Sequence, residues 1–190
     1  MTPLIQAAAT IEPTELSRND PPATSIGPRQ AAVLVLLGYD PRNGPDVLLQ
    51  QRATGLRDHP HEVSFPGGAR EQGDTSVVDT ALREAVEETG LDPTGVDAVA
   101  LLPRLLIPVS GFQVTAVIAH WRQPSGVTAV NPTETSSVVR VPLATLADPA
   151  NRLVISTDTG WHGPAFQLPG MLIWGYTAEV LNAVLHMGNW

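Results

Sequence analysis

The stretch REAVEETGL, residues 83–91, decides the interpretation of this chain. Its glutamates Glu84, Glu87 and Glu88 are spaced so that all three carboxylates share one face of a helix. Like charges this close destabilise a helix unless a cation neutralises them. Clustered glutamate oxygens suit Mg²⁺ or Mn²⁺, and Mg²⁺ commonly completes its shell with substrate phosphates. The spacing therefore indicates a phosphate-ester or pyrophosphate site, although a solvated helix face can show the same pattern.

The residues around this stretch predict a helix from about 76 to 89. Ser76 followed by Asp79 resembles a capping box, and Gly90 occupies the position of a helix C-cap. Strands are predicted at residues 30–39, 46–52, 96–103 and 113–121, with shorter ones near 138–142 and 152–156. A second, largely buried helix is predicted over 170–187. This order of elements favours one α/β sandwich over residues 29–190, preceded by an irregular leader at 1–28.

Composition excludes several classes of protein. The 190 residues are the size of one domain, and they contain neither Cys nor Lys, which rules out thiol catalysis and lysine Schiff bases. The net charge of −8 argues against nucleic-acid binding. Neither an apolar run long enough to span a membrane nor a secretory signal is visible, so the cytoplasm is the expected location.

The stretch 83–91 resembles the Nudix hydrolases. The box of that family ends in Arg-Glu, two residues, Glu-Glu, one residue, Gly and an aliphatic residue, which is the order found here. Upstream, the glycine lies one residue farther back than usual and Thr75 replaces a glutamate. The resemblance implies a Nudix-type α/β/α sandwich with a mixed β-sheet, and a metal-dependent hydrolase.

The upstream departure is similar to the coenzyme A pyrophosphatase branch of the family. That branch carries the same shift, with acidic residues at the places of Glu71 and Asp74. It also has a segment similar to LLQQRATGLRDHPHEVSFPGG, residues 48–68, with His61 here in place of the usual glycine. The resemblance covers about residues 30–185 and implies that coenzyme A is the substrate.

The resemblance also implies roles for individual residues. Glu84, Glu87 and Glu88 would hold Mg²⁺ or Mn²⁺, with the Gly68 carbonyl as a further ligand. The catalytic candidates are Glu84, Glu88 and Glu134, the last at the Asn-Pro-x-Glu position of the branch, where a turn glutamate is the alternative interpretation. Arginine forks suit phosphate oxygens, so the candidate substrate contacts are Arg52, Arg57 and Arg70. Arg83 is interpreted as structural, pairing with Asp74 or a box glutamate.

Three functions are weighed. The first is hydrolysis of coenzyme A, and of its acyl forms, to 3′,5′-ADP and 4′-phosphopantetheine. The second keeps the same machinery for ADP-ribose, NADH or an oxidised nucleotide. The third is a Nudix module that senses a nucleotide without hydrolysing it, although such modules typically lose the box carboxylates that are present here. The expected partner is a small nucleotide rather than a nucleic acid or a membrane, and a homodimer is left open.

Overall fold

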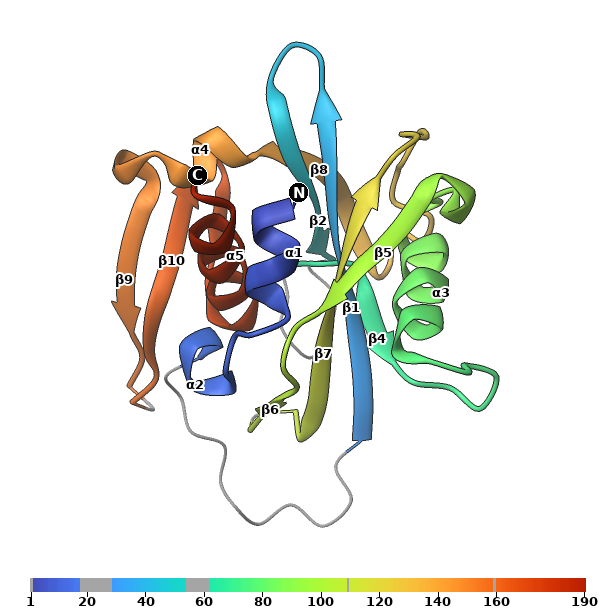
Figure 1. Cartoon of the computed structure of the whole chain (residues 1–190), viewed down its shortest axis with the longest axis horizontal. Helices are drawn as coiled ribbons and strands as arrows, with labels where there is room; N and C mark the ends of the chain where they lie inside the picture. Colours follow the sequence, from blue (N-terminus) through green and yellow to red (C-terminus); the bar gives the residue numbers. More distant parts are fainter. Residues whose placement is uncertain (1, 18–28, 54–61, 109, 159) are drawn as a thin grey trace.

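The computed structural model describes residues 2–17, 29–53, 62–108, 110–158 and 160–190 (Figure 1). Its helices are α1 (Thr2–Ala8), α2 (Pro13–Leu16), α3 (Val77–Thr89), α4 (Leu143–Ala147) and α5 (Gly175–Gly188), with 3₁₀ turns η1 (Pro93–Gly95) and η2 (Pro149–Asn151). Its strands are β1 (Arg29–Asp40), β2 (Gly44–Arg52), β3 (Val63–Ser64), β4 (Gly67–Ala69), β5 (Val96–Leu101), β6 (Leu105–Ile107), β7 (Phe112–Trp121), β8 (Thr135–Pro142), β9 (Arg152–Ser156), β10 (His162–Leu168) and β11 (Met171–Ile173). None of the described helices is long and apolar enough to cross a membrane.

β1 lies inside a mixed sheet of eight strands whose main path runs β3-β2-β1-β7-β5. β1 pairs in parallel with β7 over residues 29–37 and 112–120, and the other pairings are antiparallel. β2 pairs with β1 only from Leu37 onward, so the first half of β1 is left for β4. Residues 63–69 therefore lie between β2 and β1, which brings Gly67 and Gly68 into the sheet.

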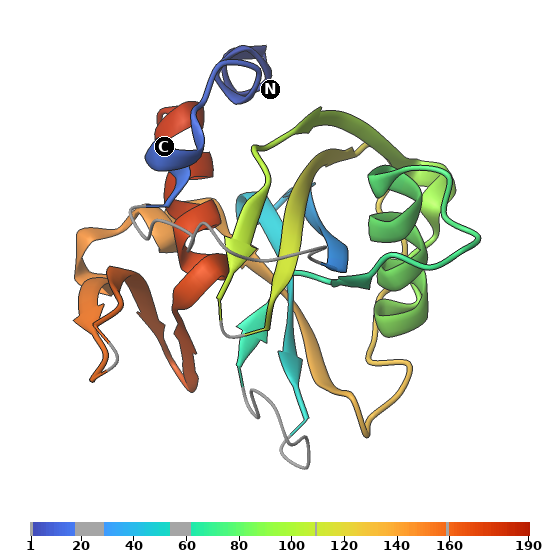
Figure 2. The ribbon, with the colours of Figure 1, turned by 90° about the horizontal axis from the view of Figure 1, so that it is seen from below.

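Helices cover both faces of this sheet. Ala32, Leu34 and Leu36 of β1 belong to the core shared with α3, whereas Val35 and Leu37 belong to the core shared with α5. Burial of both faces explains why residues 30–39 form a nearly continuous apolar run rather than an alternating one. Figure 2 shows α3 on one side of the sheet and α1 with α5 on the other. The predicted α/β/α sandwich with a mixed sheet is confirmed.

The two ends of the chain differ from the sequence expectation. The leader was expected to be irregular, but α1 and α2 are helical and bury Leu4, Ala8 and Leu16 in the core beside α5. At the other end, the helix expected from residue 170 begins only at Gly175. Residues 171–173 form β11 instead, the third strand of a small sheet with order β11-β10-β9. The first difference reflects packing of α1 and α2 against α5, and the second reflects pairing of β11 with β10; local pattern reveals neither.

Candidate functional site

Helix α3 carries the box carboxylates, and its two ends are capped as predicted. The Ser76 side chain accepts a hydrogen bond from the backbone N–H of Asp79, and Gly90 adopts a left-handed conformation with φ 67°. A left-handed C-cap suits glycine because no Cβ has to be accommodated. Ala81 and Ala85 are buried against the sheet. These features fix the helix so that its opposite side presents the glutamates.

Two glycines of β4 allow the α3 carboxylates to approach the sheet. A Cβ added at Gly67 would lie 2.4 Å from the Ala32 carbonyl oxygen, and one added at Gly68 would lie 2.5 Å from Glu84 Oε1. No larger side chain fits either position without displacement of the strand or the carboxylate. The Gly67 N–H donates to Glu88 Oε2 at 2.9 Å. The glycine pair therefore receives the carboxylates of both Glu84 and Glu88.

Arg83 links the loop before α3 to the first carboxylates of the box. Its Nε and Nη2 donate to the two Asp74 carboxylate oxygens at 3.0 and 3.1 Å, and Nη2 also donates to the Ala69 carbonyl at 2.9 Å. Its Nη1 donates to Glu84 Oε1 at 3.0 Å and to Glu87 Oε2 at 3.1 Å. The bonds that Arg83 donates to Asp74, together with one from the Glu71 backbone N–H, hold the pKa of Asp74 well below its usual range. The predicted structural pairing of Arg83 with Asp74 is confirmed.

Glu88 lies in a different environment at the other end of the helix. Burial raises its pKa to about 7, and the charge of Glu84 acts in the same direction. Hydrogen bonds from the Gly67 N–H and the Gln50 side-chain amide oppose that rise, as does the positive charge of Arg52. A carboxyl group with a pKa near 7 can hold or release a proton at neutral pH, which suits general acid–base chemistry.

The oxygen-only donor set of the box fits a hard divalent cation. Glu84 and Glu88 both lie against β4, and burial raises the pKa of Glu84 as well. Glu87 instead turns toward Arg83, and its side chain is 58% exposed. Accordingly, the described residues contain no preformed group of three metal-ligating side chains. Glu87 could join the other two by turning away from Arg83.

The three candidate arginines have different positions. Arg52 ends β2 close enough to Glu88 to affect its pKa, and its buried Nε has no hydrogen-bond partner among the described residues. Arg70 donates to the Gln30 side-chain oxygen at 3.0 Å and to the Asp74 carbonyl at 3.1 Å, so it holds the loop before α3. Arg57 lies outside the described residues, as does His61. Contact of these arginines with a substrate stays a prediction.

Glu134 lies in the turn before β8, with an exposed side chain. Its carbonyl accepts from the Ala53 N–H at 2.8 Å, which fixes the turn beside the end of β2. The next residue, Thr135, donates from its hydroxyl to Gln50 Oε1 at 3.2 Å. Gln50 in turn contacts Glu88, so the Glu134 turn is joined to the box carboxylate. A catalytic role for Glu134 stays a prediction.

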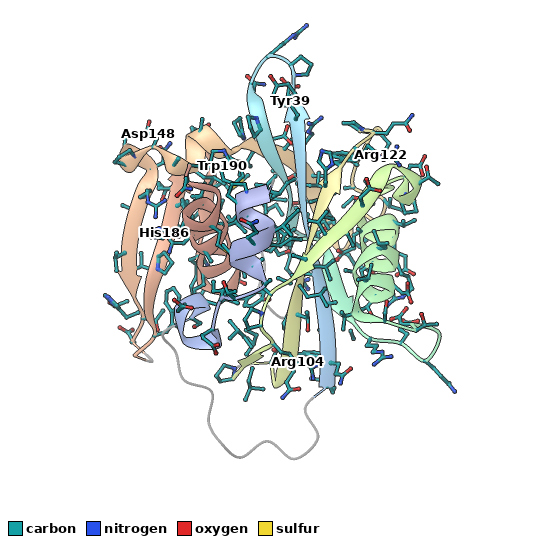
Figure 3. All side chains as sticks on the ribbon, in the orientation of Figure 1. Tyr39, Arg104, Arg122, Asp148, His186 and Trp190 are labelled. Atoms are coloured by element: carbon teal, nitrogen blue, oxygen red, sulfur yellow. The ribbon has the colours of Figure 1, made fainter. Side chains whose placement is uncertain are left out.

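Gln50 and Thr135 are the site residues that sequence reasoning missed. Alternation along β2 places Gln50 on the same face as Leu48 and Arg52, but the sequence does not reveal that this face meets α3. A polar residue following the apolar run VLL was the available signal. The C-terminal helix contributes no residue to the predicted site. Figure 3 shows His186 on α5, across the large sheet from α3.

Comparison with known protein families agrees with this geometry. Residues 28–157 match the NUDIX domain, which is more than half of the chain. The chain belongs to the Nudix hydrolase family. Members of this family generally use divalent metal ions. The match spans β1 through β9, so it includes α3, β4 and the Glu134 turn.

Relatives and solved structures point to the same family. The chain is 41% identical over 120 residues to a Nudix hydrolase NudL of Escherichia coli O7:K1, a match covering 63% of this chain and 60% of the relative. It therefore spans less than two thirds of that relative's length. A Nudix hydrolase from M. smegmatis, RenU, has a TM-score of 0.60 at 20% identity, over 85% of this chain and 86% of that one. A C. elegans Ap4A hydrolase has a TM-score of 0.52 at 20% identity, over 62% and 82% of the two chains.

Proposed function

We propose that this protein hydrolyses the pyrophosphate bond of coenzyme A, and of acyl-CoA, to 3′,5′-ADP and 4′-phosphopantetheine or its acyl form. The observation that carries the proposal is the fit of Gly67 and Gly68 against the carboxylates of Glu88 and Glu84. These glycines end the segment 48–68, whose resemblance to the coenzyme A branch favours that substrate over other nucleoside diphosphates.

Glu84, Glu87, Glu88 and the Gly68 carbonyl would hold Mg²⁺ or Mn²⁺. When bound, such an ion neutralises charge on the pyrophosphate and lowers the pKa of a water molecule. Water supplies the oxygen of the new P–O bond, and the bridging P–O bond breaks, so each product keeps one of the two phosphates. The chain's own groups then have to place the phosphates and accept a proton.

Glu88, Glu84 and Glu134 are the candidates for accepting that proton. The pKa of Glu88, raised to about 7, matches a group that accepts a proton at neutral pH. Glu134 is joined to Glu88 through Thr135 and Gln50 and is exposed, so it could receive a proton directly from solvent-accessible water. Arg52, whose Nε lacks a partner among the described residues, would contact a phosphate oxygen.

The test is hydrolysis of coenzyme A by the purified full chain with Mg²⁺ or Mn²⁺, with the products separated by chromatography. We expect 3′,5′-ADP to appear only with metal, and Glu88→Gln to reduce its rate by about 100-fold or more. Glu12→Gln is the matched control, because Glu12 is exposed between α1 and α2, the two helices that contact α5.

Two other results would each select another function. Turnover of ADP-ribose, NADH or an oxidised nucleotide, but not of coenzyme A, would keep the chemistry and overturn the substrate. The region around His61 would then be the first to examine, because it departs from the branch pattern. Tight nucleotide binding without turnover of any diphosphate would instead identify a sensing module.

A further inference from the structure

Gln50 is a buried amide placed between the box helix and β8. Its side chain is 1% exposed, although glutamine is usually found at protein surfaces. Its Oε1 accepts a hydrogen bond from the Thr135 hydroxyl at 3.2 Å. Its side chain lies on the face of β2 where Leu48 packs against α3, and there its amide opposes the rise in the Glu88 pKa as a hydrogen-bond donor does. Because the Thr135 hydroxyl donates to the oxygen end of the amide, the NH₂ end is left for Glu88, whose ionised carboxylate can only accept. The carboxylate therefore meets the NH₂ group.

The position of Thr135 depends on an irregularity in the β2–β8 pairing. Gln51 lies opposite Ser137, but the next residue, Arg52, lies opposite Thr135, so Ser136 is an extra residue on β8. The Ser136 hydroxyl donates to the Gln51 carbonyl at 3.1 Å, which fastens the irregularity to β2. Such bulges often redirect side chains next to functional sites. Here the bulge accompanies a Thr135 that is 2% exposed and bonded to Gln50.

A half-buried carboxylate such as that of Glu88 takes the direction that its hydrogen-bond donors impose. Glu88 receives the Gly67 N–H from β4 and the Gln50 amide from β2. The backbone donor cannot be varied by side-chain choice, so Gln50 is the side chain that sets the orientation. Groups that orient a metal-ligating carboxylate typically change metal affinity or activity by about 10–100-fold when removed.

We infer that Gln50, fixed by Thr135, is a positioning residue that directs the Glu88 carboxylate toward the metal. This inference rests on the proposed metal-dependent hydrolysis, but its first readout is Mn²⁺ binding without any substrate. Thr135 thereby acts on the site from a second strand, although it contacts neither metal nor substrate in the proposed scheme.

The experiment compares Mn²⁺ affinity of the full chain, measured by the electron paramagnetic resonance of free Mn²⁺, for four single variants and one double variant. Gln50→Leu removes the amide, Thr135→Val removes only the hydroxyl, and Thr135→Ser retains it. Gln51→Leu is the matched control, because Gln51 points to the opposite face of β2. Circular dichroism melting verifies that each variant folds. If Gln50→Leu fails to fold, the comparison of Thr135→Val with Thr135→Ser tests the inference on its own.

We expect Gln50→Leu to weaken Mn²⁺ binding about tenfold or more, and Thr135→Val to weaken it by a smaller factor. Thr135→Ser and Gln51→Leu should bind like the unaltered chain. The double variant Gln50→Leu with Thr135→Val should be no weaker than Gln50→Leu alone, because both changes act through one group. Coenzyme A turnover should follow the same order.

The inference is overturned if Gln50→Leu and Thr135→Val bind Mn²⁺ normally, or if Thr135→Ser is impaired as much as Thr135→Val. Normal Mn²⁺ binding by the unaltered chain without coenzyme A turnover would overturn the proposed function alone, and the variant comparison would still decide the inference. Absence of Mn²⁺ binding by the unaltered chain would overturn both.

Discussion

Asp74 and Glu88 are carboxylates at opposite ends of the same loop and helix, yet their pKa values move in opposite directions. Asp74 receives both arms of the Arg83 fork, which favours its charged form. Glu88 receives only neutral donors by hydrogen bond, so burial dominates and favours its protonated form. The charge of Asp74 therefore stabilises the fold, whereas the charge of Glu88 destabilises it. A stable frame around Arg83 and a carboxylate whose charge is disfavoured are thus built from the same residue chemistry.

The largest effect is expected where the two regions meet the sheet. Gly67→Ala would place a Cβ 2.4 Å from the Ala32 carbonyl oxygen, an atom of the backbone that cannot rotate away. We expect the free energy of unfolding to fall by about 3 kcal/mol, as measured by urea denaturation. Gly73→Ala is the control, because a Cβ there meets no atom within 4 Å. Equal stability of the two variants would contradict the close approach of β4 and β1.

Removal of Arg83 tests the frame directly. Arg83→Ala breaks the bonds to Asp74, Glu84 and Glu87 and leaves three carboxylates close together. The Arg83 side chain is only 22% exposed. We expect a loss of about 2 kcal/mol, between the values for exposed and buried ion pairs. Arg83→Lys should restore little of it, since one ammonium group cannot replace the bidentate fork. Full restoration by lysine would show that charge alone suffices.

Glu88→Gln should stabilise the protein in EDTA at pH 8. The folded pKa is raised from the usual glutamate value of 4.5 to about 7, so the favourable contribution is complete below about pH 4 and is lost as pH rises through 7. The variant has no such loss, and after allowance for solvent screening we expect a gain of about 1–2 kcal/mol at pH 8. The gain should shrink toward pH 4.5. Urea denaturation at both pH values measures it, and a less stable variant at pH 8 would refute the assignment.

The same neutralisation at Asp74 should have the opposite sign. The folded pKa of Asp74 is lowered, so its contribution is present above the usual aspartate pKa of about 3.9 and is lost as pH falls through the folded pKa. Asp74→Asn is therefore expected to be less stable than the unaltered chain at pH 7. The difference should narrow only below about pH 4. Denaturation curves between pH 3 and 7 check this, and a constant difference would argue against the ion pair as its cause.

The sequence predicted the frame around Arg83 better than the surroundings of Glu88. The capped helix, the glycine at its C-cap and the pairing of Arg83 with Asp74 are local, since all of them lie between residues 74 and 90. Local spacing carries that information. The contact of Gln50 with Thr135 joins residues 85 positions apart and depends on a bulge, which no periodicity signals.

Tertiary packing also overrode two expectations at the ends of the chain. The proline content of residues 1–28 favoured an irregular leader, but residues 2–8 form a helix that packs against α5. Similarly, the apolar pattern of MLI at residues 171–173 favours the start of a helix, but these residues form a strand because they pair with β10. Short apolar segments of this kind are settled by their neighbours rather than by their own pattern.

The burial of Leu4 at 1% exposure and Leu16 at 3% has a practical consequence for anyone who shortens the protein. A recombinant version that starts at residue 28, where the family match begins, would leave the side of α5 that these leucines cover open to water. Newly exposed apolar area promotes self-association. Such a version is expected to lose solubility on purification. A recombinant version should therefore keep α1 and α2, with any affinity tag placed ahead of residue 2.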